Sequence, residues 1–63
     1  MAYAIQQPIR TSRGVEHWFF IADVGTTPFA RDAETWLTKE LAVHVAANLQ
    51  KRNPSLTFRV VPV

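Results

Sequence analysis

Few side chains of this 63-residue chain could act as a nucleophile, an acid or a base. Its histidines are His17 and His44, its serines are Ser12 and Ser55, and it has no cysteine. Hydrolytic chemistry needs a nucleophile held beside a base. Neither serine stands at the strand-to-helix turn that exposes the nucleophile in hydrolases. We therefore predict no catalytic residue and expect a protein that is not an enzyme.

Metal and cofactor sites are not predicted either. The carboxylates close to His17 in the sequence are Glu16 and Asp23, and their spacing matches no metal-ligand pattern. The chain contains two glycines, which are too few for a glycine-rich phosphate loop. We expect no metal and no cofactor.

Aromatic and basic side chains are better suited to binding a macromolecule. Trp18, Phe20 and Arg59 would lie on one face of a sheet, because alternate residues of a strand point to the same side. Tryptophan and arginine are prominent among the residues that dominate protein interfaces. Arg10 and Arg13 stand in a predicted hairpin, where cations can hold phosphate or steer an acidic partner. The candidate partner-binding residues are Trp18, Phe20, Arg59, Arg10 and Arg13.

Two alternative arrangements would cover the face that carries Trp18. Residues 29–37 could fold over it, so that Phe29 and Trp36 pack on Trp18. Two copies of the chain could instead pair through this open face as a homodimer. In either arrangement the aromatic side chains would be core residues.

The elements that position these residues begin with two strands. Residues 3–9 are predicted to form a first strand that lies at a sheet edge or ends at Pro8, because Pro8 cannot donate a ladder hydrogen bond. Residues 10–14 are polar, end in glycine and predict a hairpin connection. Residues 15–23 are rich in β-branched and aromatic types and carry aromatics on both faces, which predicts the central strand.

One amphipathic helix is predicted to end at Asn53 and Pro54. Its start is open. Asp32 could cap a helix that runs straight through, or residues 34–37 are extended and Thr38 is the cap. We favour Thr38, because an acidic residue follows it in the first turn. The predicted apolar stripe consists of Leu41, Ala42, Val45, Ala46 and Leu49.

Together these elements predict a single α+β domain over residues 1–63. Residues 25–28 have the composition of a loop, and residues 56–61 that of a final strand. The expected fold is a small antiparallel sheet of three to four strands with the helix packed on one face, in the order ββαβ or βββαβ. One helix cannot cover both faces, so we expect it on the side of Phe19, opposite Trp18.

Charge and hydropathy bear on partners and location. The formal net charge is +2, and the cations are scattered rather than gathered in a basic stripe. No apolar segment is long enough to cross a bilayer, so no membrane partner is expected. The sequence opens without a basic region followed by an apolar stretch, which predicts a cytoplasmic protein.

Residues 13–20 resemble the octapeptide of RNA recognition motif domains, with Arg13 and Gly14 at the start and aromatics at the end. Such domains stack bases on the aromatic rings of an open sheet. The chain is too short for their βαββαβ fold, and Glu16 would repel phosphate. A small nucleic-acid-binding domain is therefore an alternative function, beside a self-associating structural module.

The part of the chain from residue 36 to residue 62 resembles small proteins encoded by phages and prophages. The similar features are an aromatic, a threonine-led helix with closely spaced alanines, and a terminal strand that ends in Val-Val-Pro. They are carried by Trp36-Leu37-Thr38-Lys39-Glu40-Leu41-Ala42, Val45-Ala46, Leu49, Asn53-Pro54 and Phe58-Arg59-Val60-Val61-Pro62. The resemblance implies a non-catalytic accessory protein that binds a host protein in the host cytoplasm. Proteins of this kind include anti-defence inhibitors, such as anti-CRISPR proteins, which block a bacterial immune complex.

Overall fold

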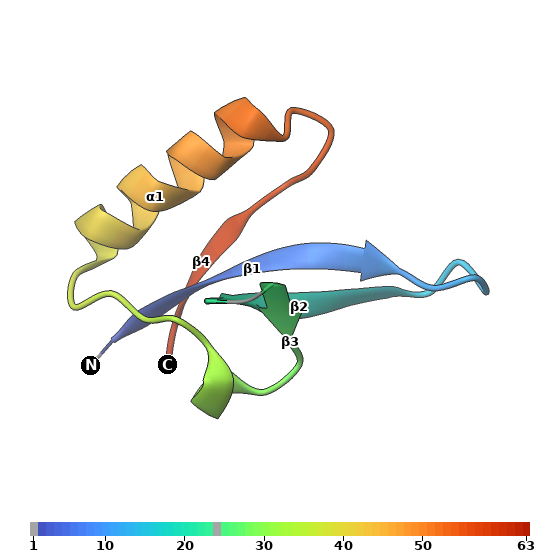
Figure 1. The fold of residues 1–63 in the computed structure, drawn as a ribbon, viewed down its shortest axis with the longest axis horizontal. Helices are drawn as coiled ribbons and strands as arrows, with labels where there is room; N and C mark the ends of the chain where they lie inside the picture. The colour runs from blue at the N-terminus through green and yellow to red at the C-terminus, as the bar shows by residue number, and fades with distance from the viewer. Residues whose placement is uncertain (1, 24) are drawn as a thin grey trace.

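Four strands and one α-helix make up the computed structural model, which describes residues 2–23 and 25–63. The strands form one antiparallel sheet in the order β3-β2-β1-β4, and the helix packs on one face of it (Figure 1). The predicted α+β class is confirmed, in its four-strand βββαβ form. In chain order the elements are β1 (Tyr3–Arg10), β2 (Glu16–Ala22), β3 (Gly25–Thr27), the 3₁₀ helix η1 (Ala30–Asp32), α1 (Lys39–Arg52) and β4 (Arg59–Pro62).

β1 is an inner strand and continues past Pro8 to Arg10, so both predicted alternatives, an edge strand and an end at Pro8, are wrong. Residues 6–10 of β1 pair with β2, and residues 3–6 pair with β4. The N–H of Val63 donates to the C=O of Ala2 at 2.9 Å, which shows that even-numbered residues of this strand turn their backbone groups toward β4. Pro8 lies beyond the last residue that β4 reaches, so its missing N–H leaves no ladder bond unmade.

The connection between β1 and β2 is the predicted hairpin turn. The N–H of Thr11 donates to the C=O of Val15, and the N–H of Gly14 donates to the C=O of Thr11, both at 2.9 Å. Gly14 has a φ of +80°, in the left-handed region that favours glycine. Local turn chemistry therefore fixes the register of the first two strands.

β3 corrects the prediction of a loop over residues 25–28. Its three residues pair with the end of β2, with Thr26 opposite Ile21 and Gly25 opposite Ala22. Threonine is a β-branched type that suits a strand, and the free edge of β2 supplies the hydrogen-bonding partner. The prediction of a loop relied on the glycine and the proline, and the composition of this segment carries no information about the free edge of β2.

α1 begins where the threonine cap predicted. The hydroxyl oxygen of Thr38 accepts a hydrogen bond from the N–H of Leu41 at 3.2 Å, and Asn53 caps the C-terminal end. The residues before Thr38 are not continuous with the helix, because η1 ends at Asp32 and an extended segment follows. The start at Thr38 is confirmed, and the alternative start at Asp32 is wrong.

Thr38→Ala removes the hydroxyl that satisfies the N–H of Leu41, and we expect it to lower the free energy of unfolding by about 1 kcal/mol. For a domain of this size, that loss lowers the melting temperature by about 4–8 °C. Thr38→Ser keeps the hydroxyl and is the matched control, with a melting temperature close to wild type in a circular dichroism scan. Identical melting of the alanine variant and wild type would show that this cap does not stabilise the helix.

The extended segment between η1 and α1 runs past the ends of β2 and β1. The N–H of Glu34 donates to the C=O of Ile21 at 3.0 Å, and Trp36 exchanges two backbone hydrogen bonds with Tyr3, at 2.8 and 2.9 Å. Opposed residues of an antiparallel pair point to the same face. Trp36 therefore shares the face of Tyr3, which is also the face of Ile5.

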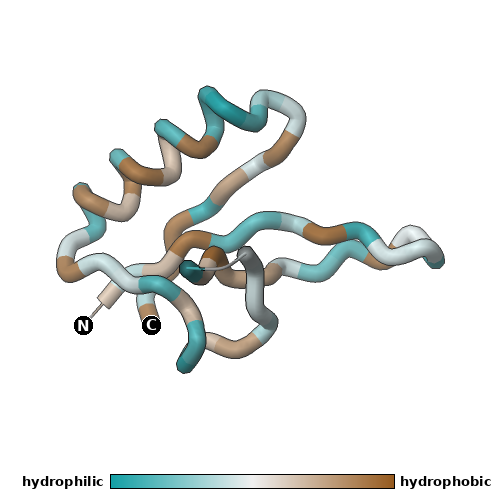
Figure 2. The backbone as a smooth tube through the Cα atoms, viewed as in Figure 1, coloured by the Kyte–Doolittle hydropathy of each residue, from teal (hydrophilic) through white to brown (hydrophobic). Residues whose placement is uncertain are grey.

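α1 covers the sheet face that carries Ile5 and Val60. These two residues are opposite each other in the β1–β4 register, and Val60 borders a groove whose other wall includes Val43 of α1. Ile5 and Ala42 are fully buried. Hydrophobic and hydrophilic stretches alternate along α1 (Figure 2), yet Leu41 is 52% exposed. The buried stripe is therefore narrower than predicted, because Leu41 lies on its flank.

The final strand is shorter than residues 56–61 and is displaced toward the C-terminus. Gln50 explains the difference, because its side-chain amide donates to the C=O of Asn53 at 3.2 Å and to the C=O of Leu56. These bonds hold residues 53–56 as a turn against the end of α1. The strand begins only at Arg59.

The core is small for the size of the chain. Among the described residues, the buried apolar side chains are Ala4, Ile5 and Ala42. The accessible surface is 4634 Å², whereas a monomer of 7.2 kDa is expected to expose about 4,100 Å². The large apolar side chains left exposed are Val15, Phe29, Leu37, Leu41, Val43 and Val63. The fold thus leaves more surface open than its mass requires.

Candidate functional site

The face of the sheet away from α1 carries Trp18 and Phe20. In the β1–β2 register Trp18 lies opposite Pro8, and Phe20 lies opposite Gln6, so these four side chains share one face. Trp18 and Phe20 are half-buried. We call the surface formed by Gln6, Pro8, Trp18, Phe20 and Arg59 the helix-free face.

Arg59 reaches across the helix-free face from β4 to β2. Its Cζ lies 3.9 Å from the centroid of the Trp18 ring, which is a cation–π contact. Its Nε donates a hydrogen bond to Oε1 of Gln6 at 2.6 Å. The guanidinium is therefore held at two points, although the residue as a whole remains exposed.

Gln6 is the site residue that sequence reasoning missed. It is 8% exposed, and a buried amide needs a hydrogen-bond partner, which Arg59 supplies. Gln6 and Pro8 are two residues apart on β1, so strand alternation places them on the same face. A glutamine on this face of the strand could have indicated a buried polar contact. Its partner was not readable from the sequence, because Arg59 lies 53 residues away.

Arg10 and Arg13 lie apart from Arg59. Arg10 ends β1 opposite Glu16, and Arg13 is exposed in the turn beyond it. Arg10 and Gln6 are four residues apart on β1, which corresponds to about 13 Å along a strand. The structure thus brings Trp18, Phe20 and Arg59 together and leaves the two hairpin arginines at the far end of the sheet.

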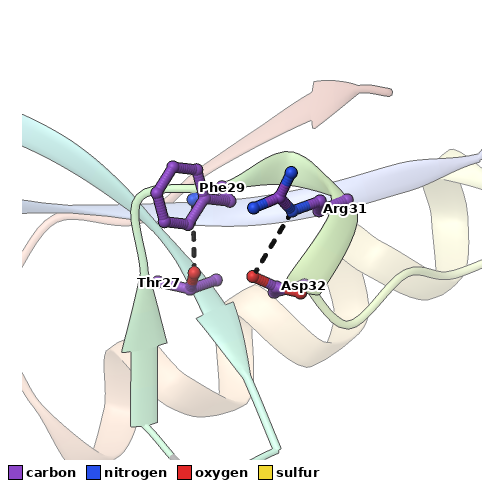
Figure 3. Close-up of polar contacts among 4 residues, drawn as sticks. All are labelled: Thr27, Phe29, Arg31 and Asp32. Carbon is purple, nitrogen blue, oxygen red and sulfur yellow. Dashed lines mark hydrogen bonds and ion pairs between the residues drawn. The ribbon is translucent and has the colours of Figure 1, made fainter.

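One prediction gave Phe29 the role of covering Trp18, and in the structure Phe29 follows β3, which pairs with β2. The N–H of Phe29 donates to Oγ1 of Thr27 at 3.2 Å, and the Cζ of Arg31 lies 4.9 Å from the Phe29 ring centroid (Figure 3). Arg31 in turn faces Asp32, with its Nε 4.0 Å from Oδ2. Phe29 is 52% exposed. Over the Trp18 ring lies the guanidinium of Arg59.

A hollow of about 380 Å³ lies beside β3 and η1. Three carboxylates border it, those of Asp23, Asp32 and Glu34, along with the hydroxyls of Thr26 and Thr27. Within the described part of the chain, no group of three or more His, Cys, Asp or Glu residues is placed to hold a metal ion. The carboxylates here thus do not converge on one point.

Two further findings complete the description of the site. In residues 2–23 and 25–63, no helix combines the length and the apolar character needed to cross a membrane. The candidate site rests on the geometry of this chain. Comparisons with protein-family models, with curated proteins and with solved structures find no match.

Proposed function

We propose that this chain is a non-catalytic protein-binding module that engages its partner through the helix-free face. The observation that carries the proposal is the position of Arg59, stacked on Trp18 and hydrogen-bonded to Gln6. An exposed side chain that is already ordered loses less conformational entropy when a partner binds. This face therefore offers a preformed recognition surface.

The chemistry of the helix-free face suits a protein surface that presents a carboxylate or carbonyl group. Arg59 uses its Nε for Gln6, and the described residues accept no second hydrogen bond from it, so its terminal N–H groups can serve a partner. Trp18 and Phe20 add apolar area beside this charge. Tryptophan and arginine in contact are the composition of an interface hot spot.

The resemblance of residues 36–62 to phage-encoded proteins supports a host protein as the partner, met in the host cytoplasm. A component of a bacterial defence complex, such as a CRISPR-type effector, is the first target to examine. A small chain with a preformed face is suited to blocking a surface rather than to reacting with a substrate.

Trp18→Ala is the variant that tests this proposal. The tagged chain recovers its partner from a bacterial host lysate, and the purified pair is then studied by calorimetry. We expect the alanine variant to bind at least about 30-fold more weakly, as expected for an interface hot spot. His17→Ala is the matched control, because His17 is exposed and is the neighbour of Trp18 on the opposite face.

Arg59→Lys tests the same surface without removing an aromatic ring. Lysine keeps the charge but not the planar fork of donors, so we expect weaker binding with an unchanged circular dichroism spectrum. The proposal fails if Trp18→Ala and His17→Ala bind equally well. It also fails if the lysate yields no partner and the chain gives phage no protection in a plaque assay on a defence-carrying host.

Nucleic-acid binding is a second proposal, supported by the presence of Trp18 and Phe20 on one helix-free face. Arg59 already covers the Trp18 ring, so a base could stack there only after Arg59 moves away. Retention of single-stranded DNA or RNA that falls steeply with added salt would support this function. A stable dimer in light scattering that Trp18→Ala dissolves would instead indicate a self-associating module.

A further inference from the structure

A second surface lies between β4 and α1. Within residues 2–23 and 25–63, β4 pairs with β1 alone, and no strand lies along its other edge. α1 and β4 lie next to each other in the ribbon (Figure 1), and a groove of about 460 Å³ is lined by residues of both. Its walls are formed by Val43, Ala46 and Ala47 of α1, by Phe58 and Val60, and by Lys39 and Gln50.

The open edge presents unpaired backbone groups next to the groove. Arg59 and Val61 face β1, as the hydrogen bond from Val63 to Ala2 and the β1–β4 register show. Because the direction of the backbone N–H and C=O groups alternates along a strand, those of Val60 and the C=O of Pro62 point away from β1, toward the open edge. Val60 offers both an N–H and a C=O, whereas Pro62 offers only a C=O. A strand placed here would find both donor and acceptor at Val60.

We propose that an extended segment of a partner protein adds to β4 as a fifth strand and places its alternate side chains in the groove. Strand addition gains affinity from main-chain hydrogen bonds and specificity from pockets for every second side chain. The five apolar residues of the walls call for apolar residues at those alternate positions. This surface is distinct from the helix-free face, and the two proposals are tested separately.

Charge indicates that the added segment is acidic. Lys39 is the one charged residue among those that form the walls, and it stands in the first turn of α1, where the helix dipole adds positive potential. The described residues that line the same groove of a second copy include Lys39 and no carboxylate. A carboxylate beside Lys39 is the complementary arrangement.

A synthetic peptide provides the test. The probe is a fluorescein-labelled peptide of about ten residues, with valine at alternate positions and glutamate at both ends, titrated with the full chain by fluorescence anisotropy. We expect a dissociation constant of about 100 µM, in the range of a small interface. A peptide with lysine in place of each glutamate should bind at least about tenfold more weakly. The acidic peptide should also slow amide-proton exchange at Val60.

Two neighbouring variants of α1 locate the binding surface. Ala47 lines the groove, whereas Asn48 does not, and both are exposed. Ala47→Glu should weaken binding of the acidic peptide at least about tenfold, whereas Asn48→Glu should change it less than about twofold. Lys39→Glu should reverse the preference between the acidic and the basic peptide.

Three results would overturn the proposal. One is the absence of binding by the acidic peptide at about 1 mM. Another is equal weakening by Ala47→Glu and Asn48→Glu, which would place the contact outside the groove. The third is a dimer of the free chain that Ala47→Glu dissolves, because the groove would then belong to a second copy. Loss of partner capture by Trp18→Ala but not by Ala47→Glu would confine partner binding to the helix-free face.

Discussion

Replacing Ile5 with alanine is expected to cost about 3 kcal/mol of the free energy of unfolding, through lost burial and the cavity left behind. Ile5 is the largest side chain among the fully buried ones. A chain of this length has a total stability of only about 3–9 kcal/mol. The substitution should therefore remove about one third or more of the free energy of unfolding, as measured by urea denaturation followed by circular dichroism.

Leu37→Ala is the matched control for this experiment. It removes a comparable amount of side chain, but Leu37 is 84% exposed. We expect its stability to stay within about 0.5 kcal/mol of wild type. If both variants lost the same stability, the side of the sheet that carries Ile5 would not be the core of the protein.

Ala42→Asp is expected to unfold the chain at room temperature. Ala42 is fully buried on the stripe of α1 that faces the sheet. A carboxylate placed there without a partner costs several kcal/mol, which is comparable to the whole stability of the domain. Far-UV circular dichroism and the dispersion of amide resonances would report the loss of helix and of packing.

Ala47→Asp makes the same substitution at an exposed position of the same helix. It carries only the lower helix propensity of aspartate, about 0.5 kcal/mol. We expect this control to remain folded. A folded Ala42→Asp variant with wild-type stability would mean that α1 does not pack closely on the sheet.

Features decided by neighbouring residues could be predicted from the sequence. Thr38 caps α1 by accepting a hydrogen bond from the N–H of Leu41, and Asn53 ends the helix. Both ends of α1 could therefore be predicted from local sequence. The two faces of β2 follow from alternation, which correctly placed Trp18 and Phe20 together. These interactions need no knowledge of the rest of the fold.

Features decided by distant pairing could not be predicted. Pro8 argues for an edge strand unless one knows that β4 stops short of it. The strand character of residues 25–27 comes from the free edge of β2 rather than from their own composition. The bond between Arg59 and Gln6 joins residues 53 positions apart. In each case the deciding partner lies in another element.

The place of β1 in the sheet sets the order of events during synthesis. β1 is the first strand of the chain, yet Tyr3 pairs with Pro62 and Gln6 with Arg59. Until residues 59–62 have left the ribosome, β1 can pair with β2 and, at Tyr3, with Trp36, but its edge toward β4 stays open to other chains. The chain loses conformational entropy when it brings residues this far apart together, and the stabilising contacts between β1 and β4 form only afterwards. Completion of this sheet is therefore an event that follows translation of β4.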